Sequence, residues 1–363
     1  MTDEAANPAR EGVTMASCLA MNPSDRLVWT VESPGYLTSV RDRTRIFLMF
    51  ARPRVCVAGG LAFYIAWVYA GQSASPQMVV GIVIAFLLNA IANLFNIYTD
   101  VVEDNENIPV RLYFLGLYGR RKLLIDTYVL CAAMLVAALA VSFPFFVAVI
   151  CGIIGTHQYS FPPFRMKARP ILGIGLFAMA LTYPYITVLT MVNNGFELLT
   201  DRTFVAPVIY LFFWLCCTVV LINNVTDYYG DRRAQVQTSA TLASTRNRAA
   251  VVAAVASIVV YLAYPVMVLV GGLPLRVLWA LVWFPPVVWV CVQMIRRDDA
   301  KSANDTLRDN VVISHGFIAT FTLLSDFSLV SVAIVAAGAI VIFLSDVFKL
   351  DTRRPEDIAS SLD

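Results

Sequence analysis

Residues 77–104 read QMVVGIVIAFLLNAIANLFNIYTDVVED, a long apolar run that ends abruptly in carboxylates. The apolar part, residues 77–99, matches the roughly 20 residues that cross a bilayer as a helix. It lacks the alternation of polar and apolar residues that marks a membrane β-strand. The stretch therefore predicts a membrane-spanning helix with acidic side chains gathered at one end.

Similar apolar runs follow one another along most of the chain, so the sequence predicts an all-α integral membrane protein with nine or ten transmembrane helices. The expected spans are roughly 54–71, 77–99, 122–142, 143–160, 170–193, 203–229, 247–270, 275–294, 309–325 and 328–346. The run over 309–325 is short and carries a histidine, so lying at the membrane interface is the alternative to crossing.

Composition excludes several classes of protein. Of the 363 residues, 59% are hydrophobic and 14% are charged, whereas soluble domains carry about 25% charged residues. A soluble globular enzyme is therefore excluded. The 27 basic and 25 acidic residues nearly cancel, which argues against a nucleic-acid partner. Two histidines, and seven cysteines without a CxxC pair, argue against a site built from His or Cys ligands.

The distribution of basic residues predicts the orientation. With the N-terminal segment in the cytoplasm, 22 of the 27 Lys and Arg residues lie in that segment or in inner loops, as the positive-inside rule requires. We divide the chain into a polar cytoplasmic extension over 1–44, flexible by default, a transmembrane domain over 45–347 and a polar tail over 348–363. A short amphipathic helix is expected over about 36–50.

A second acidic stretch repeats the pattern of the first. Residues 222–231 read INNVTDYYGD, and both stretches contain N-x-x-x-D-x-x-x-D, 127 residues apart. A spacing of four places each trio on one face of a helix. An even number of spans separates the copies, which brings both to the same side of the membrane and suggests two related halves. The trios are Asn96, Asp100 and Asp104, and Asn223, Asp227 and Asp231.

The chemistry of these trios predicts a metal–diphosphate site. Carboxylates four residues apart repel one another and need cations. Oxygen ligands suit Mg²⁺, which completes its shell with water and substrate phosphates. Nearby cations suit a phosphate ligand. The sequence thus predicts two acidic arms holding a Mg²⁺-diphosphate at the cytoplasmic mouth of the bundle, next to an apolar cavity; solvated carboxylates at helix ends are the alternative. The nearby cations are Arg111, Arg120, Arg121, Lys122, Lys167, Arg232 and Arg233.

The motifs resemble those of the UbiA superfamily of intramembrane prenyltransferases over about residues 45–325. The first motif is followed by Pro109, Arg111 and Gly116 at the family spacing. The second, over 223–232, is similar to the menaquinone-type branch. The loop over 155–167 looks like the Y-S-x-P-P-x-R-x-K loop of homogentisate prenyltransferases and chlorophyll synthases.

The resemblance implies a UbiA-type bundle with two related halves and a Mg²⁺-dependent enzyme. Such an enzyme moves a prenyl group from an allylic prenyl diphosphate to a lipophilic aromatic or quinonoid acceptor in the membrane. By matched position, the catalytic and metal-binding residues are Asp100, Asp104, Asp227 and Asp231, with Asn96 as a further metal ligand. The implied diphosphate-binding residues are Arg111, Lys167, Arg232, Asn96, Asn223, Asn224 and Tyr159. Aromatic candidates for shielding an allylic cation are Tyr98, Tyr159, Phe161, Tyr228 and Tyr229.

Four positions depart from the family pattern: Ile97, Thr226, Gln235 and Gln237. They suggest a divergent, specialised member, and they keep open a second reaction within the same fold. In that alternative, a membrane terpene cyclase traps the cation with the substrate's own double bonds. A transporter is the alternative from another class, but transport favours ionisable groups near the bilayer midplane rather than at helix ends.

Overall fold

The computed structural model describes residues 12–297 and 300–350, without the side chains of 300–302. Residues 1–11 of the predicted extension and residues 351–363 of the predicted tail lie outside the described residues. The helices are α1 (Met15–Ala20), α2 (Pro23–Glu32), α3 (Val40–Ala51), α4 (Pro53–Tyr69), α5 (Pro76–Thr99), α6 (Val101–Asn107), α7 (Pro109–Tyr118), α8 (Arg120–Val141), α9 (Phe143–Ser160), η2 (Met166–Ala168), α10 (Pro170–Thr187), η3 (Val188–Thr190), η4 (Gly195–Thr200), α11 (Arg202–Trp214), η5 (Leu215–Val220), α12 (Leu221–Thr226), α13 (Tyr228–Arg233), α14 (Arg246–Gly271), η6 (Leu275–Trp283), α15 (Phe284–Arg296), α16 (Ala300–Ser325) and α17 (Leu329–Val347).

The prediction of an all-α membrane bundle is confirmed. Within the described residues, eight helices are long and apolar enough to cross a membrane, or nine if the bent pair α3–α4 is counted as one span. These match every predicted span except 309–325. Even the close pair α8 and α9 is separate, because the single residue Ser142 ends one helix and caps the next by accepting from Phe145 N at 3.2 Å.

The span expected over 309–325 is the second part of α16, which is long enough to cross a membrane but is not among the helices that are also apolar enough. Near one end of α16, Leu307 lines a cavity. At the other end, the hydroxyl of Ser325 lies 2.9 Å from Tyr69 Oη, at the far end of α4. Phe317 and Phe321 are fully buried on it. The helix α16 packs against α4, α12, α15 and α17. Neighbouring helices therefore cover much of its surface.

The helices α3 and α4 meet at a bend of 57°. Pro53 begins α4, where its missing N–H costs nothing, and Arg52 before it takes a left-handed conformation with φ 53°. The predicted amphipathic helix over 36–50 is α3. The bend brings Arg52 and Arg54 to the end of the bundle that carries the acidic motifs.

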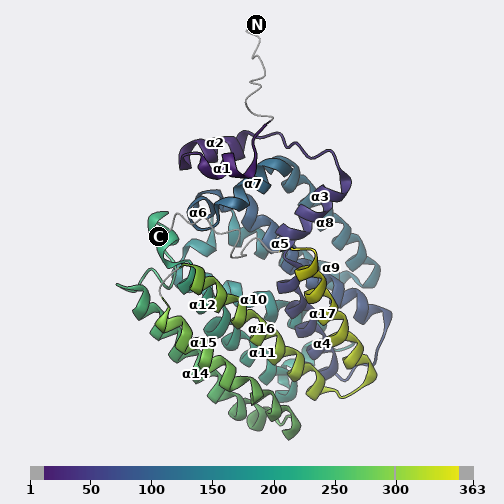
Figure 1. The fold of residues 1–363 in the computed structure, drawn as a ribbon. Helices are drawn as coiled ribbons and strands as arrows, with labels where there is room; N and C mark the ends of the chain where they lie inside the picture. The colour runs from purple at the N-terminus through teal and green to yellow at the C-terminus, as the bar shows by residue number, and fades with distance from the viewer. Residues whose placement is uncertain (1–11, 298–299, 351–363) are drawn as a thin grey trace.

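Short helices cap that same end. In Figure 1, α1, α2, α6 and α7 lie together above the long helices α4, α5, α10 and α16. The chain returns there through α17, because Asp346 near its end contacts Arg54 at 3.1 Å. The core below is rich in aromatic rings, with Trp214 stacked on Phe317 at 5.1 Å between ring centroids. The acidic motifs therefore lie over a packed bundle.

Candidate active site

The first acidic arm forms where α5 gives way to α6. Asp100 separates the two helices with φ −88° and ψ 22°. The backbone bonds continue through the break, since Asp100 N donates to Asn96 O at 2.8 Å and Asp104 N donates to Asp100 O at 2.7 Å. The spacing of four residues therefore still aligns the trio, although the helix is interrupted.

The second arm repeats this local geometry. Asp227 separates α12 from α13 with φ −89° and ψ 4°. Its N–H donates to Asn223 O at 3.2 Å, and Asp231 N donates to Asp227 O at 2.9 Å. The first aspartate of each motif thus occupies the same kind of helix break, as two related halves predict. A π-helix, η5, lies just before this arm, and such distortions are frequent at functional sites.

The two arms touch. Asn107, on α6, donates from Nδ2 to Asp231 Oδ1 at 3.2 Å. The approach is close at Gly230 on α13: a Cβ there would lie 1.6 Å from Asn107 Oδ1, so a larger residue would displace the Asn107 side chain. The acidic motifs, far apart in sequence, are therefore parts of one site.

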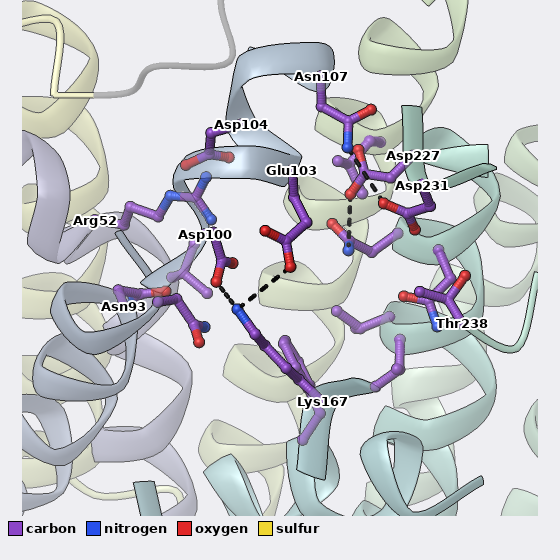
Figure 2. A pocket seen from close by; sticks show the side chains of 18 of the residues that line it. Arg52, Asn93, Asp100, Glu103, Asp104, Asn107, Lys167, Asp227, Asp231 and Thr238 are labelled. Carbon is purple, nitrogen blue, oxygen red and sulfur yellow. Dashed lines mark hydrogen bonds and ion pairs between the residues drawn. The ribbon is translucent and has the colours of Figure 1, made fainter. Parts of the chain in front are cut away.

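This site is a cavity of about 500 Å³, which we call the polar cavity. Figure 2 shows the carboxylates of both arms around it, with Lys167 rising between them. All but one of the predicted site residues line it: Asn96, Asp100, Asp104, Arg111, Tyr159, Lys167, Asn223, Asn224, Asp227 and Asp231.

Arg232 is the exception. It is exposed, and its Nη1 donates to Tyr228 Oη at 2.8 Å and to Ser244 O at 3.4 Å. It does not line the polar cavity. Adjacent helix positions face about 100° apart, so Asp231 points into the cavity while Arg232 points away from it.

Lys167 pairs with carboxylates of the first arm. It forms ion pairs with Asp100 and, at 3.9 Å, with Glu103. Burial lowers the pKa of Lys167 to about 7, and the negative charge of Asp231 opposes this shift. Arg111 likewise contacts Asp104 in a buried ion pair. Each aspartate of the first arm therefore faces a cation from outside its own helix.

Sequence reasoning missed Glu103, which is 9% exposed and lines the polar cavity. Its Oε1 accepts from Arg165 Nη2 at 2.5 Å, while Oε2 is buried without a hydrogen-bond partner in the described part of the chain. Burial raises the pKa of Glu103, and the charge of Arg165 opposes that rise. A signal was present: Glu103 follows Asp100 by three residues, which places both on one helix face.

Other residues join the site from segments that carry no acidic motif. Arg52 and Arg54 come from the α3–α4 bend, and Arg308 comes from α16. The fold brings these segments, which lie far apart in the sequence, to the same cavity.

Below the polar cavity lies a second cavity of about 250 Å³, the apolar chamber. The two adjoin, because they share the lining residues Val55, Asn93, Asn96, Tyr159, Phe177, Val219 and Val311. The walls of the chamber include Leu88, Met179, Leu181 and Leu215. The predicted apolar cavity beside the acidic site therefore exists.

The aromatic rings of the chamber differ from those expected. Of the five candidates, only Tyr159 lines it, and it is joined by Phe177, Tyr183 and Trp214. Tyr98 instead lies under the guanidinium of Arg120, 4.2 Å from ring centroid to Cζ. The candidates were chosen because they lie near a motif in sequence, whereas the three rings that join Tyr159 come from α10 and α11.

The donor set fits Mg²⁺ bound together with a phosphate ligand. In residues 12–297 and 300–350, no three His, Cys, Asp or Glu side chains are arranged to hold a metal by themselves. Mg²⁺ does not require such a cage, because it is commonly held by one or two carboxylates plus substrate phosphates and water. The carboxylates of both arms and the unpartnered Glu103 oxygen supply such ligands.

The sequence model of the UbiA prenyltransferase family matches residues 55–316. No curated protein matches significantly. A solved structure of a UbiA homolog from Archaeoglobus fulgidus bound to GPP and Mg²⁺ is 19% identical, with a TM-score of 0.55 over 80% of this chain and 99% of that chain. A digeranylgeranylglyceryl phosphate synthase structure is 12% identical, with a TM-score of 0.53 over 81% of this chain and 99% of that chain. These likenesses show the shared fold.

Proposed function

Because this chain belongs to the UbiA prenyltransferase family, we propose that it transfers a prenyl group, with Mg²⁺, from an allylic prenyl diphosphate to an aromatic or quinonoid acceptor in the membrane. One observation carries the proposal: a cavity with two acidic arms adjoins an apolar chamber inside a multi-pass bundle. That pairing suits a molecule with a charged head and a hydrocarbon tail. The GPP and Mg²⁺ held by the Archaeoglobus fulgidus homolog belong to the same ligand class.

The two arms would hold the metal–diphosphate between them. Asp100, Asp104, Asp227 and Asp231 would be the metal-binding carboxylates, with Glu103 as an addition from the structure and Asn96 as a further oxygen ligand. When bound, Mg²⁺ supplies positive charge that stabilises the leaving diphosphate. The amides of Asn223 and Asn224 and the hydroxyl of Tyr159 would contact the diphosphate oxygens.

The chain's own cations would assist departure of the diphosphate. Lys167, Arg111 and the arginines of the α3–α4 bend line the polar cavity. Fixed positive groups aimed at the developing charge lower the barrier to ionisation. Lys167 would release Asp100 as the substrate complex enters and turn to the diphosphate.

The apolar chamber would hold the prenyl tail and exclude water. The carbon–oxygen bond breaks heterolytically, leaving an allylic cation beside the faces of Tyr159 and Phe177, where cation–π attraction opposes its escape. An acceptor carbon then bonds to the cation and loses its proton. In a cyclase, a double bond of the same tail would take the place of the acceptor.

We further propose that the polar cavity opens on the cytoplasmic side. The basic loops and the acidic arms belong to the same predicted side. Water-soluble prenyl diphosphates and Mg²⁺ would then reach the site without crossing the membrane.

The decisive experiment incubates the purified protein in detergent with Mg²⁺ and C10, C15 or C20 prenyl diphosphates, with and without phenolic and quinonoid acceptors. Diphosphate release and organic products are both measured. Acceptor-dependent prenylated product supports transfer, whereas a cyclic hydrocarbon or terpene alcohol formed without acceptor supports the cyclase. An Asp100→Ala/Asp227→Ala double variant serves as the blank. Asp126→Ala, which removes a carboxylate paired with Arg43 away from the cavity, is the matched control. No diphosphate release from any substrate would overturn the proposal.

A further inference from the structure

An N-terminal segment outside the family match packs onto the acidic site. The helices α1 and α2 precede residue 55, where the match begins. Yet α1 contacts α7, and α2 contacts both α6 and α7 (Figure 1). Within the extension expected to be flexible, α2 thus packs against the helix that carries Glu103 and Asp104.

The contact with α6 is a buried polar link. Arg26, 6% exposed, donates from Nε to Asn105 Oδ1 at 2.6 Å, and Asn105 is 4% exposed. The amide of Asn105 in turn donates from Nδ2 to Pro23 O at 3.0 Å. The side chain of Asn105 is therefore held by α2 through both of its polar ends, in an environment where an unpaired polar group is costly.

Asn105 faces away from the reaction site. Its neighbours Glu103, Asp104 and Asn107 line the polar cavity, whereas Asn105 does not. One side of α6 thus presents carboxylates to the cavity, while the other side is hydrogen-bonded to the extension. A helix of seven residues has little stability of its own, so its orientation depends on such contacts.

A second seam joins the extension to α7, the helix of Arg111. Ser33 Oγ donates to Gly116 O at 2.6 Å, and Tyr36 N donates to Leu117 O at 2.8 Å. Trp29 covers Gly116 so closely that a Cβ there would lie 2.3 Å from its ring. The extension and α7 therefore approach each other closely, and these contacts fix their relative positions.

We propose that Arg26 is a positioning residue, through which the extension holds α6 and α7 in the orientation that binds the metal–diphosphate. The proposal rests on the proposed function only for the identity of the ligand. Arg26 does not touch the substrate; it acts through Asn105 on the helix that presents Glu103 and Asp104.

The test uses the full-length protein and two readouts. Binding of Mn²⁺ with inorganic pyrophosphate is followed by electron paramagnetic resonance, and backbone amide exchange is followed over residues 101–118. Arg26→Ala is expected to weaken Mn²⁺–pyrophosphate binding about 10-fold, the usual effect of losing a group that orients a ligand-bearing element. Amide exchange over α6 should rise at the same time. Asn105→Ala should reproduce both effects, and the double variant should be no worse than either single one, since both remove one link.

Arg41→Ala, which removes an exposed arginine on α3, is the matched control and should bind as the unmodified protein does. Unchanged α6 exchange in Arg26→Ala would overturn the positioning role, whatever its binding. So would weakened binding that is additive between Arg26→Ala and Asn105→Ala. Failure of the unmodified protein to bind Mn²⁺–pyrophosphate at all would instead count against the proposed function. A variant that unfolds at the same temperature as the unmodified protein has an intact bundle. If Asn105→Ala does not fold, Asn105→Ser takes its place.

Discussion

Asp100 and Asp227 occupy the same backbone position in their two arms. Each lies between two helices, and its carbonyl oxygen accepts a hydrogen bond from the N–H of the aspartate four residues later. If both hold the metal–diphosphate, Asp227→Asn should lower the rate of diphosphate release at least about 100-fold, since stabilising the charge on the leaving group is usually the largest single contribution to such catalysis. The rate is measured over a Mg²⁺ titration. A variant that keeps both its rate and its Mg²⁺ requirement would contradict the assignment.

Glu103 allows a sharper comparison, because a second glutamate on the same helix does not line the cavity. Glu103→Gln keeps the shape but removes the charge that would attract Mg²⁺. We expect the half-saturating Mg²⁺ concentration to rise about 10-fold. Glu106→Gln, on the same helix but outside the cavity lining, should leave it unchanged. Equal Mg²⁺ curves for both variants would remove Glu103 from the metal site.

Gly230 permits the contact between the arms. An alanine there would push the Asn107 side chain away and break its hydrogen bond to Asp231. We expect Gly230→Ala to cost about 1–3 kcal/mol of stability by overpacking and to reduce activity. Adding Asn107→Ala should recover the stability, because it removes the overlap, but not the activity, because the link between arms stays broken. Recovery of both would show that the link has no part in the reaction.

At the scale of elements, the candidate span α9 forms one wall of the apolar chamber and carries a thiol there. Cys151 is the exposed cysteine among the seven, and it lines the chamber. A hydrophobic maleimide should therefore label Cys151 and block use of a prenyl diphosphate, and a bound prenyl diphosphate should slow the labelling. Cys151→Ser should be active and resistant to the reagent. Inhibition that persists in Cys151→Ser would place the sensitive thiol elsewhere.

The helix α16 packs inside the bundle, although it is not among the helices apolar enough to be candidate spans. Its buried residues include Asn310, whose Nδ2 donates to Thr218 O at 3.1 Å. A polar side chain is acceptable there because its partner belongs to a neighbouring helix rather than to lipid. The choice between nine and ten predicted spans depends on this helix.

At the scale of the whole molecule, the two ends of the bundle differ in what they carry. The polar cavity, the basic loops and the extension share one end, while the α4–α5 turn lies at the other. We expect a cysteine introduced at Arg233, near the second arm, to react with an impermeant maleimide only from the cytoplasmic side. A cysteine introduced at Gln72, exposed in the α4–α5 turn, should react only from the opposite side. Labelling of both from one side would overturn the predicted orientation.

The membrane bundle and the acidic trios follow from the amino-acid sequence alone. An apolar run of about 20 residues must form a helix in lipid whatever its neighbours are, because its backbone has no other hydrogen-bond partners. The spacing of four likewise aligned Asp100 with Asp104 and Asp227 with Asp231, since backbone geometry alone sets that relation. Helix formation and the alignment of the aspartates are local properties, so local sequence patterns are enough to predict them.

Which side chains meet depends on the tertiary structure. It brought Arg308 to the polar cavity and lined the chamber with Phe177 and Trp214. It also joined Arg26 to Asn105 across 79 positions of sequence. Each of these outcomes depends on the packing of segments far apart in the chain, and the free energy of such packing has no signature within any one segment.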